Sequence, residues 1–275
     1  MIIVSDVNFN QKRGWVTRWS EEEDNILKEN YSSHSIDQLL NLLPNRNKKG
    51  IYSRAHKLGL KYHSYNKNYF AVIDTPEKAY WVGFLTADGY ITTQSRWGVE
   101  INVEDIEHLE KLNKSLDSNI TIRTREKKSY GKVSTTCSLN FKSKTMYDDL
   151  VRLGFTHDKS YNAEFSTLIP HELRLDYIKG IIDGDGSYIT TENTKRICLY
   201  SNSMSMLEAI QDTLLSHSIN STISHRECDG TNVLMITRKK DIKVFLETIL
   251  QSDSPMLSRK ESKARKLLSE IGGGH

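Results

Sequence analysis

The sequence of 275 residues is poor in cysteine and contains no long apolar run. Its three cysteines, Cys137, Cys198 and Cys228, form no CxxC pair, which argues against a disulfide framework and against a zinc site. No stretch approaches the roughly 18 apolar residues that a membrane-spanning helix needs. The first residues, MIIVSDVNFNQKRG, lack the apolar core of a secretory signal. We therefore expect an intracellular protein without a membrane partner.

Basic residues are concentrated in two blocks, although the formal net charge is only +3. Residues 46–67 contain seven lysines and arginines and no acid, and residues 120–144 contain seven against the single acid Glu126. Separated positive blocks suggest that a polyanion lies across more than one part of the chain. Either block taken alone is equally compatible with a solvated surface.

The N-terminal part of the chain predicts three short helices. Ser20 and Glu23 have the spacing of a capping box at the start of the first helix. Ser35 opens the second helix and Pro44 ends it. The third helix runs from about residue 48 to 58 and stops at Gly59. Its outer face carries the side chains that we expect to contact DNA, namely Lys48, Lys49, Tyr52, Arg54 and Lys57.

The stretches RWSEEEDNILKENY and SIDQLLNLLPNRNKKGIYSRAHKLGLK resemble the Myb/SANT-like helix-turn-helix modules found beside nuclease domains. The resemblance covers about residues 15–62 and implies that the third helix is a recognition helix. A helical protein-interaction module with a basic surface is the alternative. We assign residues 1–66 to this DNA-binding domain and expect an extended, weakly basic linker as far as about residue 73.

From residue 74 onward the chain is duplicated. The segment FLTADGYITT at 84–93 returns as IIDGDGSYITT at 181–191, and the acids Asp88 and Asp185 are 97 residues apart. Each copy predicts a helix that ends at Asp-Gly, two strands, a helix, a hairpin and a closing helix. We place the first copy at about 74–162 and the second at about 163–270. A unit this long is a folded half-domain and not a solenoid repeat.

Small residues four positions apart mark one face of each Asp-Gly helix. The pairs are Gly83 with Ala87 and Gly180 with Gly184. Two such faces allow helix axes to approach closely, so the acids that follow them become neighbours. We expect the next residues, Gly89 and Gly186, to stop the helices in a left-handed conformation.

Carboxylates at helix C-termini are poorly placed, because the helix end carries partial negative charge and unpaired carbonyl groups. A divalent cation would offset the repulsion between Asp88 and Asp185. Its further ligands would be the backbone carbonyls of Ala87 and Gly184, hard oxygen atoms suited to Mg²⁺. The alternative is that both acids merely cap tight turns.

The stretches WVGFLTADG and IKGIIDGDG resemble the two signature helices of the LAGLIDADG homing endonucleases. The resemblance covers about residues 74–268 and identifies Asp88 and Asp185 as metal-binding catalytic acids. It implies an α+β fold, a pseudo-twofold duplicated αββαββα unit whose saddle-shaped antiparallel sheets lie over DNA, here with a small N-terminal three-helix domain. Thr86 stands where the second motif has Asp183, a position that is not a ligand in the family.

The family also places basic residues near the scissile phosphates. Lys159 and Lys260 each follow the closing helix of a repeat and are the candidates for this catalytic role, with an ordinary solvated lysine as the alternative. Strand residues are expected to lie in the major groove. They are Arg123, Arg125 and Lys127 in the first repeat and Arg196, Arg226 and Arg238 in the second.

Together these features predict a monomeric endonuclease that cuts double-stranded DNA at a long asymmetric target and leaves 3′ overhangs. Mg²⁺ would be the cofactor, with Mn²⁺ or Ca²⁺ able to replace it in binding. Two other functions stay open: an RNA maturase that assists intron splicing, and a DNA-binding regulator that has lost catalysis. The intact pair of acids argues against the regulator, whereas nothing in the sequence excludes the maturase.

Overall fold

The computed structural model describes residues 18–32, 34, 36–60, 65–92, 95–129, 132–156, 163–227 and 230–272. The chain divides into two compact units, Met1–Ser64 and Tyr65–His275. Among the described residues, no helix is long and apolar enough to cross a membrane.

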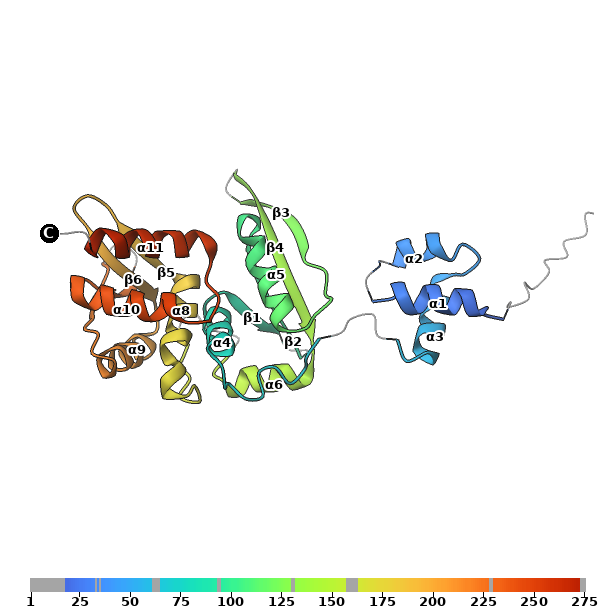
Figure 1. Cartoon of the computed structure of the whole chain (residues 1–275), viewed down its shortest axis with the longest axis horizontal. Coiled ribbons are helices and arrows are strands. Elements are labelled where there is room, and N and C mark those ends of the chain that lie inside the picture. Colours follow the sequence, from blue (N-terminus) through green and yellow to red (C-terminus); the bar gives the residue numbers. More distant parts are fainter. Residues whose placement is uncertain are drawn as a thin grey trace, which may run out of the picture. The chain divides into compact units, whose positions relative to one another are not determined.

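The N-terminal unit contains three helices, as the sequence predicts: α1 (Glu21–Asn30), α2 (Ile36–Leu42) and α3 (Lys48–Lys57) (Figure 1). The capping box of Ser20 and Glu23 is present at the start of α1. Gly59 follows α3 with φ of 69°, the left-handed conformation expected of a helix stop. Ser35, the expected start of the second helix, lies outside the described residues. A small core joins the helices and consists of Leu27, Tyr31, Leu39, Leu43, Ile51 and Ala55.

The second unit contains the predicted duplication. The first copy consists of α4 (Pro76–Asp88), β1 (Gly89–Thr92), β2 (Arg96–Asn102), α5 (Ile106–Ser115), β3 (Arg123–Ser129), β4 (Lys132–Lys142) and α6 (Lys144–Arg152). The second consists of α8 (Arg174–Asp185), β5 (Gly186–Thr190), β6 (Lys195–Ser201), α9 (Met204–Ser216), β7 (Thr222–His225), β8 (Asn232–Ile236) and α10 (Lys239–Gln251). Short 3₁₀ turns, Val103–Asp105 and His171–Leu173, precede α5 and α8.

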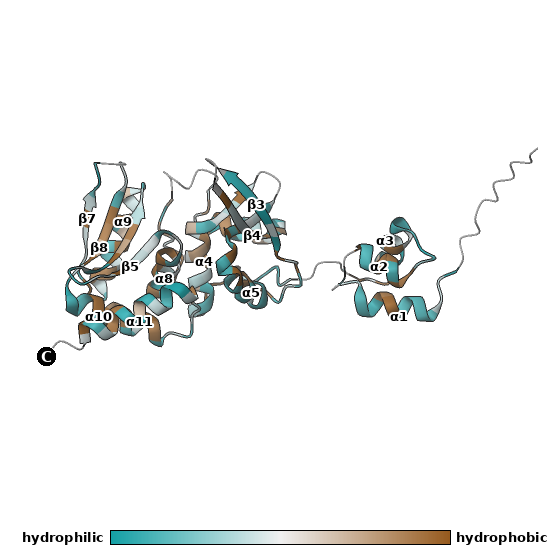
Figure 2. Cartoon of the chain, turned by 90° about the horizontal axis from the view of Figure 1, so that it is seen from above, coloured by the Kyte–Doolittle hydropathy of each residue, from teal (hydrophilic) through white to brown (hydrophobic). Residues whose placement is uncertain are grey.

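The two antiparallel sheets have the same topology, with strand orders β1-β2-β4-β3 and β5-β6-β8-β7. Helices α5 and α6 contact the first sheet, and α9 and α10 contact the second (Figure 1). Alternate strand residues face these helices in one hydrophobic core, including Trp97, Leu139, Ile197 and Leu234. The residues between them belong to the opposite face, which we call the open face of each sheet. In the first sheet, β3 is hydrophilic along its whole length (Figure 2).

Two segments differ from the sequence-based expectation. The expected linker is packed against the second unit from Tyr65 onward, because Tyr69, Phe70 and Ile73 are buried in its core. The Tyr65 hydroxyl donates to the carbonyl oxygen of Lys142 at 2.7 Å. A last helix, α11 (Ser258–Gly272), follows α10 and was not predicted. Seven of its 15 residues are charged, and its buried face consists of Lys260, Ala264 and Leu267.

Glycine explains how closely α4 and α8 approach. A Cβ atom at Gly83 would lie 2.0 Å from the carbonyl oxygen of Tyr177, and one at Gly180 would lie 2.2 Å from that of Tyr80. The predicted small-residue contact is therefore confirmed. The prediction that Gly89 and Gly186 adopt a left-handed conformation is wrong. Both have extended backbones, with φ of −73° and −108°. Glycine is needed there because a Cβ would collide with Leu85 or Cys198 backbone oxygens, at 2.5 and 2.7 Å.

Candidate active site

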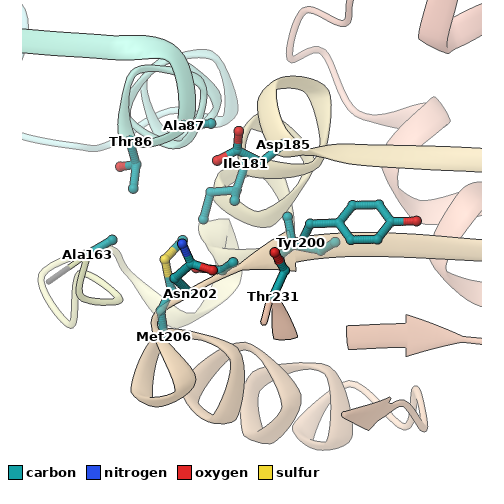
Figure 3. A pocket seen from close by; sticks show the side chains of 11 residues that line it. Thr86, Ala87, Ala163, Ile181, Asp185, Tyr200, Asn202, Met206 and Thr231 are labelled. Carbon is teal, nitrogen blue, oxygen red and sulfur yellow. The ribbon is translucent and has the colours of Figure 1, made fainter. Parts of the chain in front are cut away.

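The close contact of α4 and α8 brings the two predicted acids to one place. Each acid is the last residue of its helix. A Cβ atom at Gly184 would lie only 3.3 Å from Asp88 Oδ2, so the Asp88 carboxylate reaches the last turn of α8. Asp185 lies beside the last turn of α4, which carries Thr86 and Ala87 (Figure 3). Asp88 is half-buried and Asp185 is exposed.

Lys260, near the start of α11, lies under the same helix end. Its side chain is 5% exposed. Its Nζ donates to the backbone carbonyls of Ile182, Asp183, Gly184 and Gly186, at 2.8, 2.5, 3.2 and 2.8 Å. These carbonyls belong to the end of α8, where intrahelical donors run out and negative partial charge collects. Lys260 thus caps α8, a role that sequence reasoning missed when it treated the residue as a phosphate contact.

Burial and three carboxylates act in opposite directions on the pKa of Lys260. Burial lowers the pKa of Lys260 to about 8, and the carboxylates of Asp183, Asp88 and Asp185 act in the opposite direction. Each of these negative charges favours the charged form of the ammonium group. The geometry therefore assembles two carboxylates near the surface and one buried ammonium group beneath them.

A buried hydrogen-bond network adjoins this site. Asp183 is 0% exposed, and its Oδ2 accepts hydrogen bonds from the Tyr80 hydroxyl at 2.7 Å and from the Leu257 amide at 2.8 Å. The Tyr80 oxygen lies 2.9 Å from His108 Nε2. Burial raises the pKa of Asp183 to about 6 and lowers the pKa of His108 to about 3. The network ties α8 to α4, α5 and the segment before α11.

The sequence analysis assigned no role to Asp183, because its position is not a metal ligand in the family, and it did not identify His108. The signal that could have found Asp183 is an acid inside the apolar run IKGIIDGDG, because a buried carboxylate needs partners. Lys179 is a second case in the same helix. It is 2% exposed, and its Nζ donates to Ile249 and Ser254 carbonyl oxygens at 2.9 and 3.0 Å.

A cavity of about 250 Å³ opens beside Asp185. Its walls come from the ends of α4 and α8, the end of β6 and the start of α9, and include Thr86, Asn202 and Thr231 (Figure 3). Carboxylate, amide and hydroxyl groups therefore border one hollow. A water molecule or another oxygen-containing ligand can therefore reach Asp185 through this hollow.

The predicted basic strand residues of the first repeat share the open face. Arg123, Arg125 and Lys127 pair across the sheet with Ser138, Thr136 and Ser134 of β4. The intervening β4 residues point into the core, so the three cations lie opposite the helices. Arg123 and Arg125 are exposed. Lys127 Nζ forms an ion pair with Glu100 at 2.5 Å.

The second repeat keeps two of its three predicted cations on the open face. Arg196 lies in β6, and Arg226 follows β7, where its guanidinium lies 5.5 Å from the centre of the Tyr200 ring. Arg238 does not lie on a strand, because β8 ends at Ile236 and Arg238 is the N-cap of α10. The sequence-based prediction grouped Arg238 with the strand residues, although it directly follows the expected hairpin.

In the N-terminal unit, four of the five predicted DNA-contacting residues are exposed, and the fifth is held in an ion pair. Lys48, Lys49 and Lys57 are exposed on α3, and Tyr52 is 42% exposed. Arg54 instead binds Asp24, with Nε 2.7 Å from Oδ1 and a second contact from Nη2. Arg46 of the same basic block binds Glu23 in a similar way. Arg54 therefore joins α3 to α1, and Arg46 joins the connection between α2 and α3 to α1.

The remaining predicted site residues are Lys159 and the four metal ligands. Lys159 lies outside the described residues. Among the described residues, no group of three or more histidine, cysteine, aspartate or glutamate side chains could hold a metal ion. The predicted metal ligands are two carboxylates and two carbonyls. Of these carbonyls, Gly184 already accepts a hydrogen bond from Lys260, which leaves one of its two lone pairs.

The architecture described above is that of LAGLIDADG proteins. A LAGLIDADG-like domain model matches residues 172–250, and the WhiA LAGLIDADG-like domain model matches residues 77–137. The second unit therefore contains two LAGLIDADG-like domains, one in each repeat. The predicted Myb/SANT-like identity of the N-terminal unit stays a prediction.

Solved structures place the fold in the same group. The homing endonuclease I-WcaI bound to its DNA recognition sequence is 14% identical, covers 72% of this chain and 91% of its own, and has a TM-score of 0.54. Full-length DUF199/WhiA from Thermotoga maritima is 18% identical, with coverages of 74% and 64% and a TM-score of 0.48. I-DmoI in complex with DNA and Ca is 19% identical, with coverages of 72% and 97% and a TM-score of 0.44. No curated protein matches the sequence.

The likeness to I-WcaI confirms the predicted fold class, an α+β duplicated homing-endonuclease fold with two antiparallel four-stranded sheets. At 14% identity the likeness shows the fold alone. The chemistry of the site has to be argued from its own residues.

Proposed function

We propose that the chain is a site-specific endonuclease that hydrolyses double-stranded DNA with the help of a divalent cation. The observation that carries the proposal is the convergence of Asp88 and Asp185 at the ends of two closely packed helices. Carboxylates at helix C-termini do not stabilise the helices, so the stability of the fold does not explain why both helices end in an aspartate. The shared fold with I-WcaI, a homing endonuclease bound to its DNA recognition sequence, supports duplex DNA as the partner.

The residues present fit a hard cation. A Cβ at Gly184 would lie 2.2 Å from the Ala87 Cβ and 3.3 Å from Asp88 Oδ2, so the absence of a side chain at Gly184 lets the two helix ends approach closely enough to share an ion. Asp88 and Asp185 would hold Mg²⁺, with the Ala87 and Gly184 carbonyls as further oxygen ligands. The bound ion would activate a water molecule and stabilise the leaving oxygen of the phosphodiester.

The remaining residues would position the DNA and balance charge. The Lys260 ammonium group interacts favourably with both carboxylates, so it offsets part of their negative charge. Arg123, Arg125, Arg196 and Arg226 on the open faces would contact phosphates and base edges. In the proposed reaction a monomer spans a long asymmetric site, Lys159 assists near the scissile phosphate, and the cuts leave 3′ overhangs.

A regulator without catalysis is the second candidate. It is favoured by the match of residues 77–137 to the WhiA LAGLIDADG-like domain model. It is also favoured by Lys260, which occupies part of the oxygen set that a cation would use. A regulator would bind duplex DNA with the same open faces and leave it uncut.

The deciding experiment is cleavage of a randomised duplex library with Mg²⁺, followed by sequencing of the ends. The wild-type chain should yield one family of staggered ends. Asp88→Asn and Asp185→Asn should abolish double-strand cutting and leave affinity within about tenfold, because phosphate contacts dominate binding. Asp212→Asn, an exposed carboxylate on α9, is the matched control and should cut normally.

Each other outcome has a separate meaning. Selective duplex binding without cutting, in Mg²⁺ and in Mn²⁺, would contradict the endonuclease and establish the regulator. Binding to intron RNA with no duplex binding would establish the maturase. Normal cutting by either acid variant would remove the proposed site.

A further inference from the structure

The two repeats can be compared position by position, because their sheets have the same register. Gly89 pairs with Val99 in the first sheet, and Gly186 pairs with Leu199 in the second. Val99 in turn pairs with Leu139, and Leu199 with Leu234. We call two residues matched positions when they occupy the same place in the strand pairing of the first and the second sheet.

Arginine is kept at two matched positions of the open face. Arg96 and Arg196 each lie three residues before the core residue that pairs with the helix-ending glycine. Arg125 pairs with Thr136, and Arg226 donates its amide to the carbonyl oxygen of the matched Thr231 at 2.9 Å. The two open faces thus share a frame of cations.

The positions between these arginines differ in chemistry. Polar residues or glycine in the first sheet correspond to apolar or aromatic residues in the second. Thr92 corresponds to Ile189, Gly98 to Cys198, Glu100 to Tyr200, Ser138 to Val233 and Asn140 to Met235. The exchange of Tyr90 for Ser187 runs the other way. We call Ile189, Cys198, Tyr200, Val233 and Met235 the apolar patch.

The apolar patch does not belong to the hydrophobic core. Cys198 and Val233 are 1% and 5% exposed, yet both lie outside the core cluster. The arginines partly cover the patch. Arg196 Nη1 lies 3.9 Å from Met235 Sδ, and the Arg226 guanidinium lies over Tyr200. Arg196 Nε is buried and has no hydrogen-bond acceptor among the described residues.

The open face of the first sheet is instead a connected polar surface. The Tyr90 hydroxyl donates to Asn140 Oδ1 at 2.5 Å, across the space left by Gly98. Glu100 accepts from the Thr136 hydroxyl at 2.7 Å and pairs with Lys127. Such groups can exchange their hydrogen bonds for those of base edges.

We propose that the two open faces read different base chemistry, and that the apolar patch contacts the 5-methyl groups of thymine. The half-site that lies on the second sheet is therefore rich in A·T pairs. In the major groove the thymine methyl is the apolar feature that a side chain can recognise. The inference rests on the proposed binding of duplex DNA.

Charge complementarity selects DNA as the occupant of the patch. Arg196 and Arg226 border it at the positions that carry arginine on the basic first face. Arg196 leaves one donor unused among the described residues, and this guanidinium can turn outward to a phosphate. Its movement would uncover the Met235 side chain that it now shields.

The test removes methyl groups from the DNA one at a time. The full chain is bound in Ca²⁺ to the duplex obtained by library selection, and each thymine is replaced by deoxyuridine. Losing one contacted methyl should weaken binding about fourfold, the effect of burying one methylene-sized group. The loss should be confined to one half of the site. Binding profiles of Arg125→Ala and Arg226→Ala assign each half to its sheet.

Protein variants provide the matched control. Val233→Ser and Met235→Asn install the residues found at the matched positions of the first sheet, and they should remove the sensitivity to deoxyuridine. Ser138→Val should create it in the other half. Val233→Thr keeps the shape of valine and exchanges one methyl for a hydroxyl, so it should reduce the sensitivity and serves if the larger changes impair folding, as judged by thermal unfolding.

Two results would overturn the inference. Equal sensitivity to deoxyuridine in both halves, or sensitivity that persists in both Val233→Ser and Met235→Asn, would show that the patch does not contact methyl groups. The proposed endonuclease would survive that result if the duplex is still cut at one site. Absence of selective duplex binding by the wild-type chain would overturn both proposals together.

Discussion

Lys260 and Gly184 belong to elements 76 residues apart in sequence, and the Lys260 Nζ lies 3.2 Å from the Gly184 carbonyl oxygen. The same ammonium group satisfies three other carbonyls at the end of α8. α11 therefore stabilises the helix end that carries Asp185. The predicted catalytic acid Asp185 and the lysine that caps its helix thus come from opposite ends of the second repeat.

Lys260→Met should destabilise the chain, because it leaves buried carbonyl groups without a donor. Each unsatisfied group costs about 1–3 kcal/mol, and partial hydration should limit the total to about 3 kcal/mol. Chemical unfolding measures the loss, and Lys263→Met, an exposed lysine of the same helix, is the control. Unchanged stability combined with slow single-turnover cleavage would restore the phosphate-contact role expected from the sequence.

Gly83→Ala should destabilise the helix crossing and impair cleavage together. Its Cβ would meet the Tyr177 carbonyl oxygen at 2.0 Å, so α4 and α8 must move apart. Overpacking of this kind costs about 1–3 kcal/mol or more. Gly272→Ala meets nothing within 4 Å and is the control. Urea unfolding and plasmid linearisation are the measurements, and wild-type behaviour of Gly83→Ala would contradict the close contact.

Local patterns in the sequence were sufficient for much of the fold. The capping box at Ser20, the doubled Asp-Gly helix ends and the alternation of Arg123 and Arg125 are short-range features, and the structure contains all of them. The small residues Gly83 and Gly180 also predicted the helix contact, because only close approach requires them.

Long-range partners account for what the sequence did not predict. The role of Lys260 depends on α11 meeting the end of α8, and Arg54 is neutralised by Asp24, 30 residues earlier. Tyr69 and Phe70 have no local periodicity, yet they fill the core of the second unit. No local rule distinguishes such residues from a linker or a solvated surface.

Acidification should destabilise the second unit through His108. Its pKa is about 3 in the folded chain and 6.5 in a model peptide, so between these values the unfolded state binds the additional proton. Stability is therefore full above pH 6.5 and falls as the pH decreases, by about 2 kcal/mol at pH 5. The raised pKa of Asp183 acts in the opposite direction between its own two values, so the net loss is smaller.

His108→Gln should reduce this loss, because glutamine can still donate to Tyr80 but does not titrate. The measurement is the unfolding free energy at pH 7 and pH 5 for wild type, His108→Gln and the exposed control His56→Gln. A variant whose stability falls as much as that of the wild type would show that His108 does not bind the decisive proton.

The N-terminal unit should extend the DNA contact on one flank. Its exposed lysines on α3 would bind phosphates, whereas Asp88 and Asp185 belong to the other unit. Removing residues 1–64 should shorten the footprint on one side and weaken binding, with cut positions unchanged. The truncation ends before Tyr65 because that residue packs against Phe141, with ring centroids 5.3 Å apart. An unchanged footprint and affinity would favour the protein-interaction module instead.

Two substitutions on α3 separate DNA contact from structure. Lys49→Ala removes an exposed cation and should flatten the salt dependence of binding by about one log-log unit, with little change in thermal stability. Arg54→Ala breaks the pair with Asp24 and should lower the thermal stability of the N-terminal unit first. Salt titrations of binding and thermal unfolding of both variants decide between these roles. If Arg54→Ala weakens binding as much as Lys49→Ala and leaves stability unchanged, Arg54 leaves Asp24 and contacts DNA, as the sequence predicts.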